Sequence, residues 1–292
     1  MNELRLSVVL PAHNEEDCII DTIREVRQAL ESAGISHEII VVDDGSKDRT
    51  AERARSENII LIQHRTNLGV GAARKSGIAR AKAELVATTD VDGTYPNQDI
   101  PHLLQTLQDH DLDMVIGARI GKNVVREWPH RWIPKFLIRR LASYLCQRSI
   151  PDLNSGLRIF KKSMALDYFY LLPDSHSWES TITLAFLSNK KNVEFVPIDY
   201  YRRKGGKSSF APVGDTYNYL MLVVRTTMYF NPLRIFIPVS LFLMLIGLVK
   251  TIYDWEVFRR IGSLDVIIVL GGMLILLVGL IADLIVVVSR KK

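Results

Sequence analysis

The sequence predicts an α/β domain with a mostly parallel, doubly wound sheet, followed by a C-terminal hairpin of two transmembrane helices. Short apolar runs of strand length alternate with runs of helical apolar spacing through about the first 200 residues. Polar segments follow several of the strand-length runs directly. Two long apolar runs are confined to about the last sixty residues, and this asymmetry separates a water-soluble part from a membrane part.

Length, charge and cysteine content limit the classes of protein to consider. The 292 residues hold one large α/β core and an appendage. The formal net charge of +5 fits nucleic acid, anionic lipid or a phosphorylated substrate and does not choose among them. Cys18 and Cys146 are the only cysteines, which excludes a disulfide framework and a cysteine-rich metal site and suits a reducing compartment.

The first two predicted strands end in polar segments. Ser7–Leu10 has the apolar character of a buried strand, and the stretch 15–31 that follows has apolar residues at helical spacing. The pattern repeats at 38–42, which runs into Asp43-Asp44-Gly45-Ser46 and precedes a predicted helix through Arg53. Regular alternation of strand and helix predicts parallel strands with helices on both faces.

The next two strands complete the predicted cleft. A third strand is expected at 59–63, and a helix after 67–71 leads to a fourth strand at 84–89. The fourth strand runs into Asp90-Val91-Asp92-Gly93. Because ligands of open α/β sheets bind at the carboxyl ends of strands, we expect one cleft to collect the residues at these ends. They are Pro11, Asp43, Asp44, Asp90 and Asp92.

The remaining part of the domain ends in a basic loop. Strands are predicted at 114–118 and 193–200, with a helix around 179–187. The segment 201–209 is basic and contains two glycines, a composition suited to binding an anion. We place the α/β domain at residues 1–210 and an amphipathic juxtamembrane segment at residues 211–231.

Both C-terminal apolar runs approach the roughly 20 residues that a helix needs to cross the hydrocarbon layer. Transmembrane helices are predicted at about 232–250 and 264–288, followed by a short basic tail to residue 292. Buried core helices are the alternative, but they need a large apolar domain around them, and no other part of the sequence supplies one. Self-association through these helices is a further expectation.

The orientation of the hairpin is less clearly encoded. Arg259 and Arg260 lie in the connecting turn, so the positive-inside rule alone does not orient the two spans. The early apolar run Leu6–Leu10 ends at Pro11 and is too short for a signal sequence. We therefore expect an integral membrane protein whose α/β domain is cytoplasmic.

Asp90 and Asp92 are the candidate metal ligands. In a continuous strand their carboxylates would point to opposite faces, but at a strand end that turns through Gly93 they can converge on one ion. Hard oxygen ligands favour Mg²⁺ or Mn²⁺, and a diphosphate can supply further oxygens. The alternative is an ordinary acidic turn, because aspartates are common in turns.

Two further groups of polar residues at strand ends remain ambiguous when taken alone. Asp43 and Asp44 can accept hydrogen bonds from a nucleoside, or can form a plain Asp-Gly turn in which Ser46 or Asp48 caps the next helix. Glu15 can cap a helix or reach a nucleotide hydroxyl. Both interpretations stay open for each group.

The stretch from Trp128 to Phe136 combines spaced aromatics with basic residues, among them Arg131. Such a stretch suits the lipid headgroup layer, where it would deliver a lipid phosphate to the cleft. An amphipathic helix packed on the core is the alternative interpretation. A nucleic-acid binder is not expected, because the basic residues accompany two membrane spans and no binding module.

In combination, these motifs resemble the family 2 glycosyltransferases of the GT-A fold, in particular the dolichol-phosphate mannose synthase and bacterial polyprenyl-phosphate glycosyltransferase branch. The resemblance covers almost the whole chain, and the motifs follow the family order. The matching motifs are Pro11-x-x-Asn14-Glu15, Val42-Asp43-Asp44-Gly45-Ser46, Asn67-x-Gly69-x-Gly71, Asp90-x-Asp92-Gly93, Gly117-Ala118-Arg119, Asp152-x-x-Ser155-Gly156-x-Arg158 and Arg203-x-x-Gly206-x-Ser208.

The resemblance implies a role for each matching position. It implies that Asp92, Arg119 and Arg203 take part in catalysis, with Arg119 at an acceptor phosphate and Arg203 at the donor diphosphate. It implies that Asp92, Asp90 and Thr94 bind the metal. The expected substrate-binding positions are Pro11, His13, Glu15, Asp43, Asp44, Asp90, Arg119, Arg131, Ser155, Arg158, Arg203, Lys207 and Ser208.

The chain departs from the family pattern at two positions. Thr94 stands where a glutamine often completes the metal shell, which leaves the third ligand open. Ser209 stands where a lysine usually follows Ser208, so that Lys204 or Lys207 is the expected substitute.

The expected reaction moves one sugar from a UDP- or GDP-sugar onto a polyprenyl phosphate, such as undecaprenyl or dolichyl phosphate, with inversion at the anomeric carbon. A lipid phosphate is already anionic, so it needs no strong general base. Two alternatives remain: a family 2 transferase that acts on another lipid or polysaccharide acceptor, and an inactive membrane scaffold of the same fold.

Overall fold

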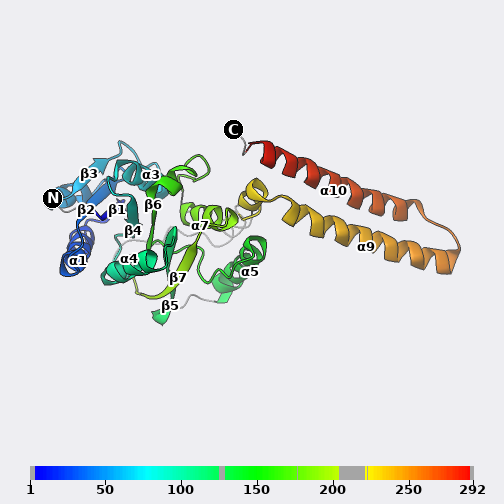
Figure 1. Ribbon diagram of the computed structural model, residues 1–292, viewed down its shortest axis with the longest axis horizontal. Helices are drawn as coiled ribbons and strands as arrows, with labels where there is room; N and C mark the ends of the chain where they lie inside the picture. Colours follow the sequence, from blue (N-terminus) through cyan, green and yellow to red (C-terminus); the bar gives the residue numbers. More distant parts are fainter. Residues whose placement is uncertain (1–3, 125–128, 176, 204–220, 222, 290–292) are drawn as a thin grey trace.

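The computed structural model describes residues 4–124, 129–175, 177–203, 221 and 223–289. These residues form an α/β domain and a long helical hairpin that projects from it (Figure 1). The domain contains a seven-stranded sheet with the order β3-β2-β1-β4-β6-β5-β7.

The N-terminal half of the domain is a parallel α/β unit. β1 pairs with β2 and β4, and β2 pairs with β3, all in parallel. Ala12 at the end of β1 is level with Asp43 at the end of β2, so these strands deliver their following residues to one edge of the sheet. The elements are β1 Leu6–Ala12, α1 Ile19–Ser32, β2 His37–Asp43, α2 Thr50–Arg55, β3 Ile60–Gln63, α3 Val70–Arg80 and β4 Leu85–Thr88.

The second half adds a strand that the sequence pattern did not predict. β6 lies between β4 and β5 and is antiparallel to both, whereas β5 and β7 are parallel. β5 also extends beyond the predicted 114–118. The elements are η1 Asn97–Asp99, α4 Ile100–Asp109, β5 Met114–Val124, α5 Pro129–Cys146, β6 Arg158–Lys161, α6 Lys162–Leu166, α7 Trp178–Ser188 and β7 Val193–Tyr200.

Helices cover both faces of the sheet, which confirms the doubly wound prediction (Figure 1). Alternate residues of β1 enter different cores, because successive side chains of a strand point to opposite faces. Val9 packs in the core that contains Trp178 of α7, and Leu10 packs in the core that contains Ile23 of α1 and Leu103 of α4.

The C-terminal hairpin consists of α9 Leu233–Phe258 and α10 Ser263–Ser289. Both helices are long and apolar enough to cross a membrane. Only 11% and 17% of their most apolar windows are buried, so they are not core helices of the α/β domain. α9 begins and α10 ends near that domain (Figure 1). The hairpin therefore has the form expected of two membrane spans.

Polar contacts and glycines hold the two helices of the hairpin together. At the turn, Lys250 Nζ of α9 lies 2.6 Å from Asp254 and 2.6 Å from Asp265 of α10. Gly272 and Gly279 let α10 approach α9 closely, because an added Cβ would lie 2.5 Å from Met244 and 2.5 Å from Phe236. α9 continues as a helix to Phe258, beyond its apolar run.

Candidate active site

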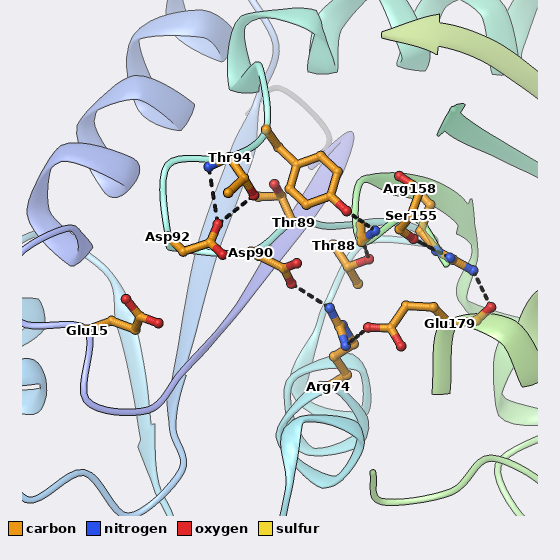
Figure 2. Close-up of polar contacts among 12 residues, drawn as sticks. Glu15, Arg74, Thr88, Thr89, Asp90, Asp92, Thr94, Ser155, Arg158 and Glu179 are labelled. Carbon is orange, nitrogen blue, oxygen red and sulfur yellow. Dashed lines mark hydrogen bonds and ion pairs between the residues drawn. The ribbon is translucent and has the colours of Figure 1, made fainter. Parts of the chain in front are cut away.

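Acidic side chains gather at the carboxyl ends of β1 and β4. Asp90 and Asp92 follow β4 in a turn that passes through Gly93, whose φ is 72°. Glu15 follows β1 and is buried at 8% exposure. Figure 2 shows these three carboxylates at the same end of the sheet. Strand order thus brings Asp90 and Asp92, which were expected in one cleft, together with Glu15, which was expected among the substrate-binding residues.

Asp92 is held by the residue that the sequence analysis proposed as a third metal ligand. The backbone N–H and the hydroxyl of Thr94 donate to Asp92 Oδ1 over 3.1 and 2.6 Å (Figure 2). Burial and the nearby Asp90 carboxylate raise the pKa of Asp92, while Thr94 and Arg203 oppose the rise. Thr94 therefore orients Asp92, and its role as a metal ligand stays a prediction.

Arg203 follows β7 and contacts two of the acids. Its Nη2 lies 2.5 Å from Glu15 Oε1, and its Nε lies 3.4 Å from Asp92 Oδ2. Burial raises the pKa of Glu15, Arg203 opposes this, and Asp92 and Asp90 add to the rise. A guanidinium is thus held where negative charge accumulates, and the same charge would attract a divalent cation.

Asp90 rests on a buried ion-pair network that the sequence analysis missed. Arg74 of α3 is fully buried and donates through Nη2 to Asp90 Oδ1 over 2.6 Å. Its Nη1 donates to Glu179 of α7 (Figure 2). Its guanidinium lies 5.4 Å from the centroid of the Trp178 ring. The available signal was the position of Arg74 beside Ala73, Gly77 and Ile78, all of which are buried in α3.

The buried Asp44 carboxylate makes its contacts within the protein. It is 2% exposed, and its carboxylate accepts from the backbone N–H of Leu68 (2.9 Å) and Gly69 (2.8 Å) and lies 2.7 Å from His64 Nδ1. These contacts hold the segment before α3 against the end of β2. The arrangement favours a supporting role over direct contact with a nucleotide.

The turn after β2 is the Asp-Gly turn that the sequence analysis left open. Asp43 Oδ1 accepts from the Ser46 N–H over 3.2 Å, and Gly45 has a φ of 69°. His13 lies beside this turn, with Nδ1 2.8 Å from the Asp44 carbonyl oxygen. Pro11 is buried within β1. Asp43 is also buried, whereas His13 is partly exposed.

Arg119 is paired with Asp152, the first residue of another of the matching motifs. Its Nε and Nη2 donate to the two oxygens of Asp152 over 2.7 and 2.9 Å, and its guanidinium lies 5.1 Å from the Tyr200 ring. Burial acts to raise the pKa of Asp152, but Arg119 and backbone N–H groups hold that pKa at about 2. The Arg119 side chain remains 26% exposed and therefore accessible to a ligand.

Ser155 and Arg158 lie in the core, although the sequence analysis expected them to contact substrate. Ser155 is fully buried and donates to the Gly117 carbonyl over 2.5 Å. Arg158, also fully buried, donates to the carbonyl of Glu179 and the hydroxyl of Thr183, both over 3.0 Å. Burial lowers the pKa of Arg158 to about 10. Because both side chains are buried and bonded to backbone carbonyls, their positions favour support of the 152–158 segment over substrate contact.

Three of the predicted substrate-binding side chains lie outside the described part of the chain. Lys207 and Ser208 lie outside the described residues. The backbone of Arg131 belongs to α5, but its side chain is outside the described part of the chain. Within that described part, no cluster of three or more His, Cys, Asp or Glu side chains is arranged to hold a metal.

Comparison with known families identifies the chain. The model for glycosyl transferase family 2 matches residues 7–169, which is more than half of the chain. The chain belongs to glycosyl transferase family 2. A second model, described as the GtrB C-terminal hairpin, matches residues 231–287 and so covers α9 and most of α10. The match to this hairpin family supports membrane insertion of these two helices.

Several curated proteins are similar to this family 2 member. An uncharacterized protein of Methanocaldococcus jannaschii is 33% identical over 170 residues, which cover 56% of this chain and 68% of that protein. The dolichyl-phosphate beta-glucosyltransferase of Dictyostelium discoideum is 27% identical, covering 68% of this chain and 66% of the relative. The undecaprenyl-phosphate 4-deoxy-4-formamido-L-arabinose transferase of Edwardsiella ictaluri is 28% identical, with coverages of 70% and 62%. The chain spans between 48% and 68% of the length of such relatives.

Solved structures share the fold. Glucosyl-3-phosphoglycerate synthase from Mycobacterium tuberculosis, in complex with Mn²⁺, UDP and phosphoglyceric acid, superposes with a TM-score of 0.59 at 18% identity. The match covers 76% of this chain and 78% of the synthase. The same synthase with Mg²⁺ and UDP gives a TM-score of 0.58 at 17% identity, covering 76% and 79%. At this identity the likeness concerns the fold, and it confirms the GT-A prediction.

Proposed function

We propose that the chain transfers a single sugar from a nucleoside-diphosphate donor to a polyprenyl phosphate, with the α/β domain at the cytoplasmic face of the membrane. The observation that carries the proposal is the meeting of Glu15, Asp90 and Asp92 with Arg203 at the carboxyl ends of the strands. Carboxylates that bind a cation, beside an arginine that binds phosphate, suit a sugar nucleotide.

A divalent cation fits the donor half of this site. Asp90 and Asp92 supply hard oxygen ligands, and the charge of three neighbouring acids exceeds that of Arg203 alone. Because two carboxylates do not complete a shell, the donor diphosphate would supply further oxygens. When bound, Mg²⁺ or Mn²⁺ would offset the negative charge that develops on the diphosphate. The M. tuberculosis synthase, solved with Mn²⁺ and UDP, supports this choice by its fold.

In this proposal, Arg203 changes partners when the donor enters. Its guanidinium leaves Glu15 and Asp92 and donates to the diphosphate, whose oxygens can accept two N–H groups of the guanidinium at once. Thr94 keeps the Asp92 carboxylate oriented during this exchange. Arg203 would then stabilise the leaving group in the transition state.

The acceptor half of the site contains Arg119. The exposed part of the Arg119 side chain can contact an acceptor phosphate, which would compete with Asp152 for the guanidinium. A phosphate oxygen of the acceptor forms a bond to the anomeric carbon as the bond to the donor diphosphate breaks. The nucleoside diphosphate departs, and direct displacement inverts the anomeric configuration. The acceptor is already anionic, so no side chain has to remove a proton.

The membrane hairpin and the relatives support a lipid acceptor. α9 and α10 would hold the site next to the bilayer, where a polyprenyl phosphate resides. Three similar proteins are named as dolichyl-, undecaprenyl- and dodecaprenyl-phosphate sugar enzymes. The cytoplasmic orientation is part of the proposal, because the reaction needs sugar nucleotides and these are present in the cytoplasm.

A donor and acceptor panel tests the proposal. Purified full-length protein in detergent is incubated with labelled UDP- and GDP-sugars, with undecaprenyl or dolichyl phosphate, and with Mn²⁺, Mg²⁺ or a chelator. We expect one sugar to appear on the polyprenyl phosphate only when a divalent cation is present. Transfer to a glycerolipid or polysaccharide instead would refute the acceptor, and binding of no sugar nucleotide would refute the donor class.

A further inference from the structure

The strongest unassigned feature is the buried arginine beneath Asp90. Arg74 is 0% exposed, and its guanidinium is shared between two carboxylates from different elements (Figure 2). One is Asp90, whose side chain is 34% exposed at the candidate site, and the other is Glu179, which is buried. Arg74 thus connects the core with the exposed acid.

The Arg74 and Glu179 pair is poorly suited to a purely stabilising role. Arg74 Nε and Glu179 Oε2 are buried and have no hydrogen-bond partner among the described residues. Buried polar atoms without partners cost free energy, and an apolar replacement of a buried ion pair is often at least as stable. The pair also places Arg74 so that its Nη2 donates to Asp90 Oδ1 over 2.6 Å, and an apolar replacement would lose this hydrogen bond.

Asp90 is confined from its other side by Gly156. A Cβ added to Gly156 would lie 2.7 Å from Asp90 Oδ2, so a larger residue at this position would push the carboxylate aside. The Gly156 backbone is itself fixed, because its N–H donates to the Tyr95 hydroxyl over 2.7 Å and its carbonyl accepts from Thr88 over 2.9 Å. The carboxylate therefore has a guanidinium on one oxygen and a rigid backbone beside the other.

We propose that Arg74 is a positioning residue that fixes the Asp90 carboxylate for binding of the donor and its cation. Glu179 holds the guanidinium from behind, and Gly156 limits rotation of the carboxylate. The inference rests on the proposed function, since the orientation of Asp90 matters to donor binding only if the donor binds there. Residues that orient a ligand of a metal typically change metal affinity about 10- to 100-fold when altered.

The test compares two conservative variants in full-length protein in detergent. Arg74→Lys keeps the charge but replaces the fork that spans Asp90 and Glu179 by a single ammonium. Glu179→Gln keeps Arg74 and its contact with Asp90. Binding of UDP and of GDP is measured by calorimetry over a series of Mn²⁺ concentrations, together with the thermal midpoint. The control variants are Arg27→Lys and Glu57→Gln, which alter an ion pair of 2.8 Å between α1 and the segment after α2.

We expect Arg74→Lys to weaken Mn²⁺-dependent nucleotide binding about 10-fold or more, and Glu179→Gln to weaken it by less than about threefold. Both control variants should bind as wild type does. Gly156→Ala should weaken binding as Arg74→Lys does, because it displaces the same carboxylate from its other side.

Three results would overturn the inference. The first is wild-type nucleotide affinity in a folded Arg74→Lys variant. The second is a loss of nucleotide affinity that is in proportion to the fall in thermal midpoint, with the same proportion in Arg74→Lys and Glu179→Gln. That pattern would indicate a structural role only. The third is failure of the wild-type protein to bind UDP or GDP with Mn²⁺, which refutes the proposed donor class as well and is thereby distinguished from the first two. Should Arg74→Lys fail to fold, Gly156→Ala with wild-type affinity is the deciding negative result.

Discussion

The pairing of Asp152 with Arg119 gives a stability change that can be calculated from the structure. Asp152→Asn keeps the size of the side chain but removes the charge that accepts two hydrogen bonds from Arg119. The pKa of Asp152 is held at about 2, against an ordinary value of 3.8. The difference corresponds to about 2 kcal/mol of stability at neutral pH.

The pH dependence of this contribution has a defined sign. Because the folded-state pKa lies below the unfolded value, the stabilisation is complete above about pH 4 and is lost as the pH falls toward 2. At pH 7 the variant should therefore unfold about 4 to 8 °C below wild type, for a domain of this size. Near pH 2 the two midpoints should converge.

Thermal unfolding of the full-length protein in detergent, followed by circular dichroism, measures this difference. Asp111→Asn is the matched control, because Asp111 also faces a cation, Lys161 at 3.3 Å, but its side chain is 94% exposed. That control should change stability by less than about 0.5 kcal/mol. A midpoint of Asp152→Asn within about 1 °C of wild type at pH 7, or a deficit that persists unchanged at pH 2, would refute the reasoning.

Three further predictions concern the donor site and its supporting turn. Arg203→Ala should lower kcat/KM for the sugar nucleotide about 100-fold or more, because the leaving diphosphate loses a charged hydrogen-bond donor. Steady-state kinetics check this, and a normal rate would remove Arg203 from the mechanism. Asp92→Ala should abolish the Mn²⁺ dependence of donor turnover, and normal turnover would remove the metal assignment. Gly45→Ala should destabilise the fold by about 1 to 3 kcal/mol, since Gly45 has a φ of 69° and an added Cβ would lie 2.5 Å from the Thr66 backbone; an unchanged thermal midpoint would contradict this.

The sequence alone determined the elements whose signals are local. The apolar runs before Pro11, Asp43 and Asp90 predicted three strands of a mostly parallel sheet, because a buried strand is recognised from a few consecutive residues. The turn through Gly93 was likewise readable from adjacent residues. Length and apolarity predicted the two helices of the hairpin, since a membrane span is a property of one continuous segment.

The tertiary structure decided which distant residues meet. Arg203 contacts Glu15 across 188 residues of sequence, and Arg74 contacts Glu179 across 105. Likewise, β6 is a four-residue strand whose place between β4 and β5 depends on both neighbours. Such contacts depend on how strands are ordered and helices packed, and no periodicity in one segment records that order. Burial also distinguished residues that the motifs alone did not: Ser155 and Arg158 lie in the core, whereas the side chain of Arg119 stays partly exposed.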